Sequence, residues 1–421
     1  MQITIRSILN RVLSLKGFVY EEVRWAKGRK PMIEVKIRPR RGHPGVCSGC
    51  HQAGPTYDHL PERRFWFIPL WMIPVVWLYA MRRVDCPQCG VKVEAVPWAC
   101  GKRRMVLIAM QFLAGWARRV AWREVARCFG TSWQAVHRSV EWVVEWGLKQ
   151  RDLKGIVAIG IDEIHWGKGK GANRFLTLAY QLDAGSKRLL WVGRKRTKAT
   201  LRRFLREMGP TVCGGIGFVC SDMWKPYLEV VRVHLPKAVQ ILDPFHVIRK
   251  LNEAVDAVRR QEVGALRREG KKPWLTDTRW ILLRRWKNLR GGMRETMKDL
   301  LRRNLRTVRA YMLKEDFACF WKYKSVKWAR IFLSVWTERA LRSRLDPMRQ
   351  VARTLRAHET LLYNWFTSRK QWNNGAVEGF NNKIRVVTRR SYGFRTYGAM
   401  ELALYHTLGA LPEPPVTHRF W

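Results

Sequence analysis

The sequence is short of acidic residues, and this shortage is its most informative bulk property. Only 33 Asp and Glu residues accompany 80 Lys and Arg residues in a chain of 421, so the formal net charge is +47. Such an excess destabilises a compact chain by self-repulsion unless a polyanion lies nearby. The basic residues run along the whole chain, which favours an extended track of nucleic-acid phosphates over one anchoring patch. The alternative is a merely solvated basic surface.

Uninterrupted apolar runs of membrane-spanning length are also missing. The best candidate, residues 65–81, is shorter than about 20 residues and is interrupted by Pro69 and Pro74. We expect it to form a buried strand or hairpin, and we expect no membrane partner. Residues 1–13 lack the apolar run and cleavage site of a secretory signal. No Gly-Lys-Ser phosphate loop occurs, so the use of ATP is not indicated.

The nine cysteines do not form the even framework of a secreted disulfide protein, which favours a reducing cytosol. Four of them form two Cys-x2-Cys pairs, Cys47 with Cys50 and Cys86 with Cys89. Two such pairs predict a four-thiolate Zn²⁺ site, with Gly49 and Gly90 supplying backbone freedom at the turns. The alternative is four free buried cysteines. The other five are expected to be packing residues: Cys100, Cys128, Cys213, Cys220 and Cys319.

Residues 101–150 have the pattern of a helix-turn-helix. Helical segments are expected over 106–120, 122–129 and 133–146, with a turn at Gly130 and a cap at Thr131 or Ser132. An ordinary helical hairpin is the alternative, because the motif has little sequence specificity. The expected inward-facing residues are Val125, Ala126, Val136 and Val140. The expected outward-facing, DNA-contacting residues are Gln134, His137 and Arg138.

The pattern changes near Gly155, where short apolar runs begin. Strands are expected over 156–161, 175–182, 188–192, 216–220 and 238–242, with helices over 198–208 and 226–233. This order is that of an RNase H-like mixed sheet. Residues 246–370 are basic and helical in pattern, and their tryptophans are expected to be core residues more often than base-stacking platforms. Residues after about Gln371 return to the sheet domain, and the tail from Pro412 is expected to be irregular.

Two aspartates each end a predicted strand. Asp162 follows the run 156–161, and Asp222 follows the run 216–220. Adjacent strands would place the two carboxylates side by side, as a Mg²⁺ or Mn²⁺ site for phosphodiester chemistry requires. Either aspartate alone could instead be a cap or a turn former.

A third acid, Glu378, opens a helix with a polar face. Val377, Phe380, Ile384 and Val387 share one apolar face at helical spacing. Glu378, Asn382, Arg385 and Arg389 share another. This face makes sense if Glu378 holds the cation and the other three contact DNA. The alternative is an acid that favours the start of a helix.

Neighbouring residues compete for these roles. Glu163 follows Asp162, and in a strand it would point to the opposite face. Asp243 also ends a strand and could replace Asp222, although with His246 it could instead cap the next helix. His165 and His246 are candidates for supporting or DNA-contacting groups, and a structural hydrogen-bonding role is at least as plausible for each.

The chain resembles the insertion-sequence L-three family of bacterial DDE transposases. The resemblance rests on the cysteine pairs, the helix-turn-helix and five stretches in the family's order: Gly160-Ile161-Asp162-Glu163, Ser221-Asp222-Met223, Asp243-Pro244-Phe245-His246, Asn374-Gly375-x-x-Glu378-Gly379-x-Asn381 and Arg389-Arg390-x-Tyr392-Gly393. It implies an RNase H-like catalytic domain, the triad Asp162, Asp222 and Glu378, and recognition of terminal inverted repeats. No residue of the triad departs from the family pattern.

The resulting expectation is an α/β (α+β) protein in five segments. They are a zinc-ribbon-containing domain (1–100), a helix-turn-helix domain (101–150), the first part of an RNase H-like domain (151–245), a helical insertion (246–370), and the last part with a tail (371–421). We expect double-stranded DNA as the partner, a homodimer on DNA, and a location at the bacterial nucleoid in the cytoplasm. The alternatives are a catalytically silent DNA-binding regulator, a nuclease without strand transfer, and a basic peripheral membrane protein.

Overall fold

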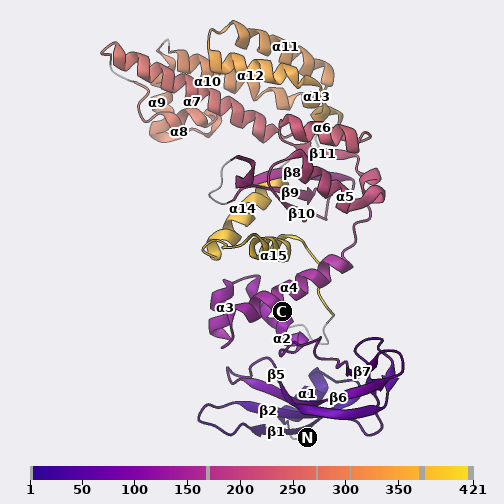
Figure 1. Ribbon diagram of the computed structural model, residues 1–421. Coiled ribbons are helices and arrows are strands. Elements are labelled where there is room, and N and C mark those ends of the chain that lie inside the picture. The colour runs from indigo at the N-terminus through magenta and orange to yellow at the C-terminus, as the bar shows by residue number, and fades with distance from the viewer. Residues whose placement is uncertain (1–2, 167–170, 272–273, 304, 369–374, 416–421) are drawn as a thin grey trace. The chain divides into compact units, whose positions relative to one another are not determined.

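The computed structural model describes residues 3–166, 171–271, 274–303, 305–368 and 375–415, without the side chains of residues 172–173 and 375–378 (Figure 1). The chain forms two compact units, one of residues 1–152 with 383–421 and one of residues 153–382. The second boundary falls within helix α14, Gly375–Arg390. The first unit is therefore assembled from two segments that lie far apart in the sequence.

The first unit begins with helix α1 and a five-stranded sheet. The elements are α1 (Ile5–Val12), β1 (Phe18–Trp25), β2 (Ile33–Pro39), β5 (Thr56–Trp66), β6 (Val75–Cys86) and β7 (Gly90–Val93). The order is β1-β2-β6-β5, with β7 also on β6, and only the β2–β6 pair is parallel. Phe65 and most of β6 are buried, so the expectation of a strand or hairpin over residues 65–81 is confirmed. Trp77 lies at the centre of this core, stacked on Phe67.

Helices α2 (Leu107–Ala117), α3 (Trp122–Cys128) and α4 (Trp133–Gln150) follow this sheet. Gly130 turns the chain between α3 and α4 with a φ of +60°, which glycine adopts without steric cost. The Ser132 hydroxyl accepts a hydrogen bond from Ala135 N and caps α4. The four residues predicted to face inward are all buried: Val125, Ala126, Val136 and Val140.

The C-terminal residues complete this helical layer. Helix α15 (Tyr397–Leu408) packs against α4, and the following residues continue without regular structure as far as the described part of the tail reaches. Gly147 of α4 leaves no room for a side chain, because a Cβ there would lie 2.7 Å from Pro412 O and 2.8 Å from Leu411 Cβ. The Gln111 amide donates a hydrogen bond to Pro414 O. The tail is therefore held against α2 and α4.

The second unit contains a mixed five-stranded sheet. Its strands are β8 (Ala158–His165), β9 (Phe175–Gln181), β10 (Arg188–Arg194), β11 (Phe218–Ser221) and β12 (Val239–Leu242), in the order β10-β9-β8-β11-β12. The first three strands pair antiparallel, and β11 pairs parallel with both β8 and β12. Each strand lies close to its predicted range. The exception is β8, which continues past Asp162 to His165, so Asp162 lies inside the strand and not at its end.

Two helices cover one face of this sheet. Helix α5 (Lys198–Gly215) contributes Leu201 and Phe204, and α6 (Lys225–His234) contributes Tyr227, to a core that also contains Ile159 and Ile161 of β8. Side chains alternate along a strand, so residue 163 lies on this same face and residue 162 on the other.

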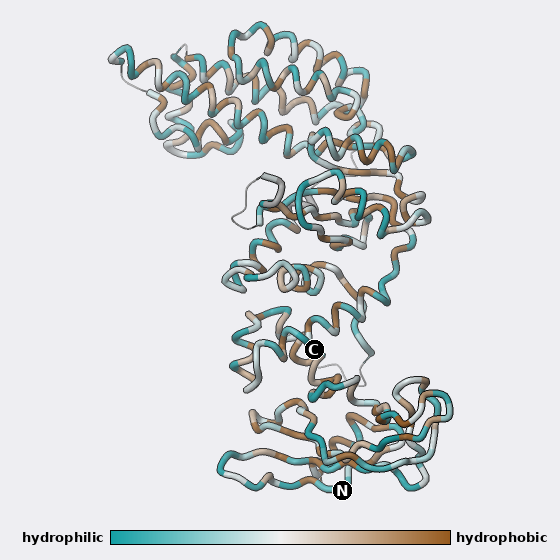
Figure 2. The backbone as a smooth tube through the Cα atoms, viewed as in Figure 1, coloured by the Kyte–Doolittle hydropathy of each residue, from teal (hydrophilic) through white to brown (hydrophobic). Residues whose placement is uncertain are grey.

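Residues 244–367 form helices joined by turns, with no strand among the residues that the structure describes there. The helices are α7 (Pro244–Arg268), α8 (Arg279–Leu283), α9 (Gly291–Leu301), α10 (Arg306–Phe317), α11 (Val326–Arg342), α12 (Asp346–Ala357) and α13 (Glu359–Thr367). Hydrophilic and hydrophobic residues alternate around them (Figure 2). Trp336 and Trp365 are core residues as expected, but Trp274, Trp280 and Trp328 are exposed. Among the described residues, no helix is both long and apolar enough to cross a membrane.

Candidate active site

Asp162 is the acid at the centre of the mixed sheet. It is 8% exposed, and Asn381 of α14 donates a 2.6 Å hydrogen bond from Nδ2 to its Oδ2. Phe380 of α14 stacks on Tyr180 of β9, with ring centroids 4.6 Å apart and planes 10° apart. Burial, and to a smaller extent the charge of Asp162, raise the pKa of Tyr180. These contacts place the part of α14 that belongs to the second unit against the Asp162 face of the sheet.

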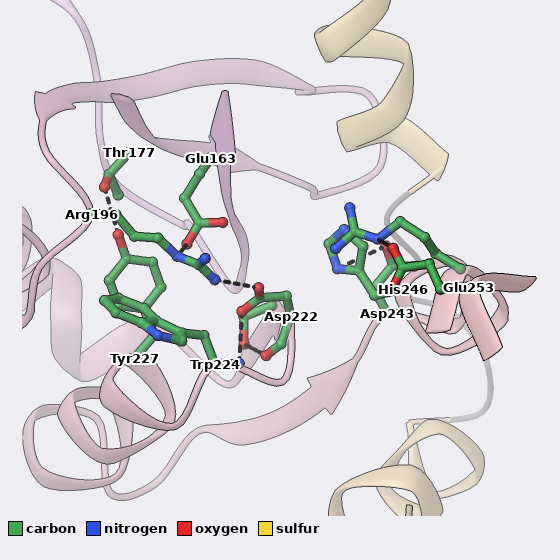
Figure 3. A network of polar contacts seen from close by, with 11 residues as sticks. Glu163, Thr177, Arg196, Asp222, Trp224, Tyr227, Asp243, His246 and Glu253 are labelled. Carbon is green, nitrogen blue, oxygen red and sulfur yellow. Dashed lines mark hydrogen bonds and ion pairs between the residues drawn. The ribbon is translucent and has the colours of Figure 1, made fainter. Parts of the chain in front are cut away.

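Asp222 directly follows β11, next to the strand of Asp162. The parallel pairs end at Cys220 with Gly160, and Asp222 and Asp162 each lie two residues beyond that pair. Asp222 accepts hydrogen bonds from Arg196 Nη2 to Oδ2 (2.8 Å) and from Trp224 N to Oδ1 (2.9 Å) (Figure 3). The adjacent-strand placement predicted for the two aspartates is therefore present.

Glu163 points to the face opposite Asp162. Its Oε1 accepts a 2.7 Å hydrogen bond from Arg196 Nε, and its side chain is 9% exposed. Burial, and next the charge of Asp222, raise the pKa of Glu163 to about 8. Glu163 is engaged by Arg196 on the other face of the sheet, which favours Asp162 over Glu163 as the cation ligand.

Glu378 lies in the first turn of α14, but its side chain is outside the described residues, as is that of Val377. Helical spacing puts position 378 one turn before Asn381. Further along, Phe380, Ile384 and Val387 are buried as predicted. Asn382, Arg385 and Arg389, the predicted DNA contacts, are exposed.

The competing residues have other contacts. Asp243 follows β12 and caps α7, because its Oδ1 accepts a hydrogen bond from Phe245 N. His246 is buried with its Nδ1 3.7 Å from Asp243 Oδ2 (Figure 3). His165 is exposed, and its Nε2 accepts a hydrogen bond from Arg174 Nε. The parallel register still brings Asp243 level with Asp222, so the choice between them is not decided by strand position.

The set of oxygen donors on β8, just after β11 and on α14 fits a hard divalent cation in its chemistry. It offers the carboxylate oxygens of Asp162 and Asp222 and the Oδ1 of Asn381, which is buried and has no hydrogen-bond partner among the described residues. Oxygen ligands of this kind suit Mg²⁺ or Mn²⁺. No three carboxylates of the described residues converge on one point, so a third protein ligand would have to come from elsewhere, and Glu378 is the candidate.

The four paired cysteines do converge. The sulfur atoms of Cys47, Cys50, Cys86 and Cys89 all lie within 4.8 Å of one another, and Cys50 Sγ and Cys86 Sγ are 3.4 Å apart. The short strands β3 (Gly45–Val46) and β4 (Ala53–Gly54) flank the first pair. Backbone hydrogen bonds from Cys50 and Gly49 lower the pKa of Cys47 to about 7. The cluster could bind zinc, whose tetrahedral sites use thiolates at about 2.3 Å.

The glycines and the remaining cysteines refine these expectations. Gly90 has a φ of +68°, as a tight turn requires. Gly49 is needed for space instead, since a Cβ there would lie 3.0 Å from Cys89 Sγ. Cys220 is buried as expected, but Cys100 and Cys128 are exposed, so the expectation that they are packing residues is wrong for these two.

The predicted DNA-contacting residues of α4 differ in exposure. Gln134 and Arg138 are exposed. His137 is half-buried, with its ring 5.7 Å from that of Trp122 and 5.1 Å from that of Trp133. Because His137 packs against two tryptophans, less of its side chain is exposed for DNA contact than the sequence pattern predicted.

Sequence patterns missed two residues of the site, Arg196 and Asn381. Arg196 lies in the turn after β10 and was indistinguishable from the many other arginines of the chain. Asn381 belongs to the motif after Glu378, and its position three residues later was the available signal.

The sheet order, the strand directions and the two aspartates on neighbouring strands together fit an RNase H-like transposase domain. Comparison with known proteins agrees. The profile of a protein family described as Transposase matches residues 159–404. The chain therefore belongs to the insertion-sequence L-three family of transposases.

Curated relatives extend the similarity beyond the matched residues. The transposase for insertion sequence element IS1001 of Bordetella parapertussis is 26% identical over 394 residues, which cover 93% of this chain and 95% of that protein. The transposase for insertion sequence element IS1557 of Mycobacterium tuberculosis is 27% identical over 445 aligned positions, with 96% and 95% coverage. The similarity therefore includes the N-terminal sheet and helices.

Proposed function

We propose that the chain binds the terminal inverted repeats of an insertion sequence, cuts the DNA there and joins the freed ends to target DNA. The observation that carries the chemistry is that Asp162 and Asp222 each lie two residues beyond the same β8–β11 pair, with the start of α14 held to Asp162 through Asn381. Family membership supports the same reaction class, because transposases cut and recombine DNA.

In this proposal Asp162, Asp222 and Glu378 hold the divalent cations. Mg²⁺ or Mn²⁺, when bound, stabilises the negative charge that develops on attacking and leaving oxygens. Asn381 fixes the orientation of the Asp162 carboxylate. Asn382, Arg385 and Arg389 contact phosphate oxygens along the exposed face of α14, and the DNA phosphates offset part of the +47 charge.

The proposed reaction has two phosphoryl transfers. In the first, water attacks the phosphorus at the end of the element, and the 3′ oxygen leaves and takes up a proton. In the second, that 3′ hydroxyl loses its proton and attacks a phosphorus of the target strand. The target 3′ oxygen bonded to that phosphorus then leaves and takes up a proton. The protein contributes mainly by positioning the reactants and stabilising charge.

The N-terminal parts are proposed to recognise DNA. Residues 1–100 would form a zinc-ribbon-containing domain around Cys47, Cys50, Cys86 and Cys89, and residues 101–150 a helix-turn-helix with Gln134, His137 and Arg138 on its recognition helix. The exposed Gln134 and Arg138 support this assignment, and His137 supports it least. Residues 151–245 and 371–421 would form the catalytic domain around the insertion 246–370, with residues 383–421 also completing the first unit. Because two ends are cut together, we propose a homodimer on DNA.

The test is cleavage of end-sequence DNA in Mg²⁺ or Mn²⁺ by Asp162→Asn, Asp222→Asn and Glu378→Gln. Each variant should lose cleavage and retain DNA binding. Wild-type rates in all three variants would make the site assignment wrong, and an inactive wild-type chain that binds the ends would favour a silent regulator. Cleavage without joined products on a gel would favour a nuclease. Asp243→Asn is the companion variant, and it should keep activity if Asp222 is the ligand.

A further inference from the structure

Arg196 joins two acidic side chains of the candidate site. It donates one hydrogen bond from Nε to Glu163 and one from Nη2 to Asp222, at 2.7 and 2.8 Å (Figure 3). Its guanidinium also lies over the ring of Trp224, 4.4 Å from the centroid. Hydrogen bonds from a charged guanidinium to a carboxyl group are stronger than those between neutral groups. Arg196 thus links Asp222, which follows β11, to Glu163 of the neighbouring strand β8.

The chain on both sides of Arg196 is anchored. The Thr177 hydroxyl donates a 2.8 Å hydrogen bond to Lys195 O and lies 2.6 Å from the Tyr227 hydroxyl. On the other side, Thr197 caps α5 by accepting a hydrogen bond from Thr200 N. These contacts fix the backbone before and after Arg196. The planar guanidinium presents its N–H donors in a fixed arrangement, so it loses less freedom per hydrogen bond when it binds two carboxylates.

The contacts of Asp222 leave part of its carboxylate available. Arg196 Nη2 occupies one position on Oδ2, and Trp224 N occupies one on Oδ1. Each carboxylate oxygen accepts at about two lone-pair positions, so two of about four remain for a cation or its water. The contacts therefore fix the orientation of the carboxylate without using up its capacity.

Arg196 also offsets negative charge at this place. Its guanidinium pairs with the carboxylates of both Glu163 and Asp222, at 2.7 and 2.8 Å. Arg196 is itself only 25% exposed. Its loss would leave two partly buried acidic side chains close together without a positive partner, which is costly.

We propose that Arg196, anchored by Glu163, is a positioning residue that orients the Asp222 carboxylate for a divalent cation. The inference rests on the proposed function, in which Asp222 is a cation ligand. Groups that orient the ligands of a cation typically change its affinity by about 10–100-fold when they are removed. Arg196 therefore affects the cation concentration that cleavage needs, whereas an arginine that binds phosphate would affect the affinity for DNA.

The experiment measures cleavage of end-sequence DNA by the full chain over a range of Mg²⁺ concentrations, then of Mn²⁺. Arg196→Gln should raise the half-saturating Mg²⁺ concentration by about 10-fold or more. Arg196→Lys and Glu163→Gln should raise it less, since each keeps part of the hydrogen bonding. Saturating Mn²⁺ should restore part of the rate in each variant. The Kd for end DNA without a cation should stay within about twofold, because the phosphate contacts are elsewhere.

Arg203→Gln is the matched control. Arg203 also combines an ion pair, with Glu207, and a position over a tryptophan, Trp191, but it lies on α5 away from the acids. It should leave the Mg²⁺ requirement unchanged. A melting temperature for each variant separates loss of fold from loss of orientation, and Arg196→Lys and Glu163→Gln give the readout if Arg196→Gln does not fold.

Two results would overturn the inference. One is an unchanged Mg²⁺ requirement in all folded variants, and the other is weakened DNA binding at an unchanged requirement, which would make Arg196 a DNA contact. The proposed function fails in a different way, through wild-type cleavage by Asp222→Asn. The two failures are therefore distinguishable.

Discussion

Asn381 donates a 2.6 Å hydrogen bond from its amide nitrogen to Asp162, a residue 219 positions earlier in the chain. The amide oxygen of Asn381 is buried and has no partner among the described residues. Burying an acceptor without a donor costs free energy, so such groups in native proteins usually bind a ligand or an ordered water. The amide nitrogen of Asn381 thus holds the acid, while its amide oxygen is left without a donor.

Asn381→Ala should reduce cleavage by about 10–100-fold while the affinity for end DNA stays nearly unchanged. The change removes a hydrogen bond to a charged group, worth about 1.5–3 kcal/mol, from the orientation of Asp162. Single-turnover cleavage at saturating Mg²⁺ measures the effect. Asn364→Ala is the control, because Asn364 also donates a single amide hydrogen bond, to Gln240 O. Equal losses in both variants would assign Asn381 a purely structural role.

Cys86→Ser should release the metal of the cysteine cluster and unfold its surroundings. The purified wild-type chain should carry about one zinc ion, as a four-thiolate site does, and the variant should carry almost none. Elemental analysis and release by a chelator measure this. Cys100→Ser removes an exposed cysteine outside the cluster and should keep the full content. Zinc-free wild-type protein that is fully folded would contradict the proposed zinc site.

Arg82→Met should lower the free energy of unfolding of the N-terminal sheet by about 3–5 kcal/mol. Arg82 and Glu94 form a buried ion pair, with side chains 6% and 1% exposed, and Glu94 also accepts hydrogen bonds from Tyr79 and Arg82 N. Removal of one partner leaves the other charge buried alone. Urea titration measures the change.

The next residue on the same strand provides the control for that prediction. Arg83 pairs with Asp58 where both side chains are about 40% exposed, at 39% and 41%. Exposed pairs contribute about 0–1 kcal/mol, so Arg83→Met should cost little. Similar costs for the two variants would show that burial does not decide the value of these pairs.

The stability of the first unit should fall as the pH drops below about 6.5, because of His406. Burial, then the charges of Arg118 and Arg390, lower the pKa of His406 to about 3 in the folded chain. Between these pH values the unfolded chain binds a proton that the folded chain does not, so stability is lost as the pH falls, by about 1.4 kcal/mol per pH unit. Urea titrations at pH 7 and pH 5 should differ by about 2 kcal/mol more in wild type than in His406→Leu. A change at the exposed His59, His59→Gln, should leave the difference as in wild type.

The sequence was sufficient for features with a local or repeating signal. Apolar runs located the five strands of the mixed sheet, and helical spacing located the buried face of α14 at Phe380, Ile384 and Val387. The two Cys-x2-Cys pairs predicted a cluster that the fold does assemble. Each of these patterns lies within a few residues, or depends on a spacing that chemistry fixes.

Features that depend on distant partners could not be predicted in this way. The parallel pairing of β2 with β6 joins strands about 40 residues apart, and no local pattern specifies it. The role of Arg196, which follows β10, depends on contacts with Glu163 of β8 and with Asp222 after β11, and these form only in the folded sheet. The predicted end of β8 was wrong. Asp162 and Glu163 follow an apolar run, which predicts that the strand ends there, whereas antiparallel pairing with β9 continues through both to His165.

The attachment of the tail to α2 and α4 has a consequence for biosynthesis. The ribosome releases residues 1–152 first, but Leu411 and Pro412 leave it only after the whole second unit has been made. Until then the surface of α4 around Gly147 is uncovered, and the packing of α2 and α4 is incomplete. A nascent chain that stops before α15 would leave that part of α4 uncovered, and incompletely packed segments of this kind are prone to aggregation.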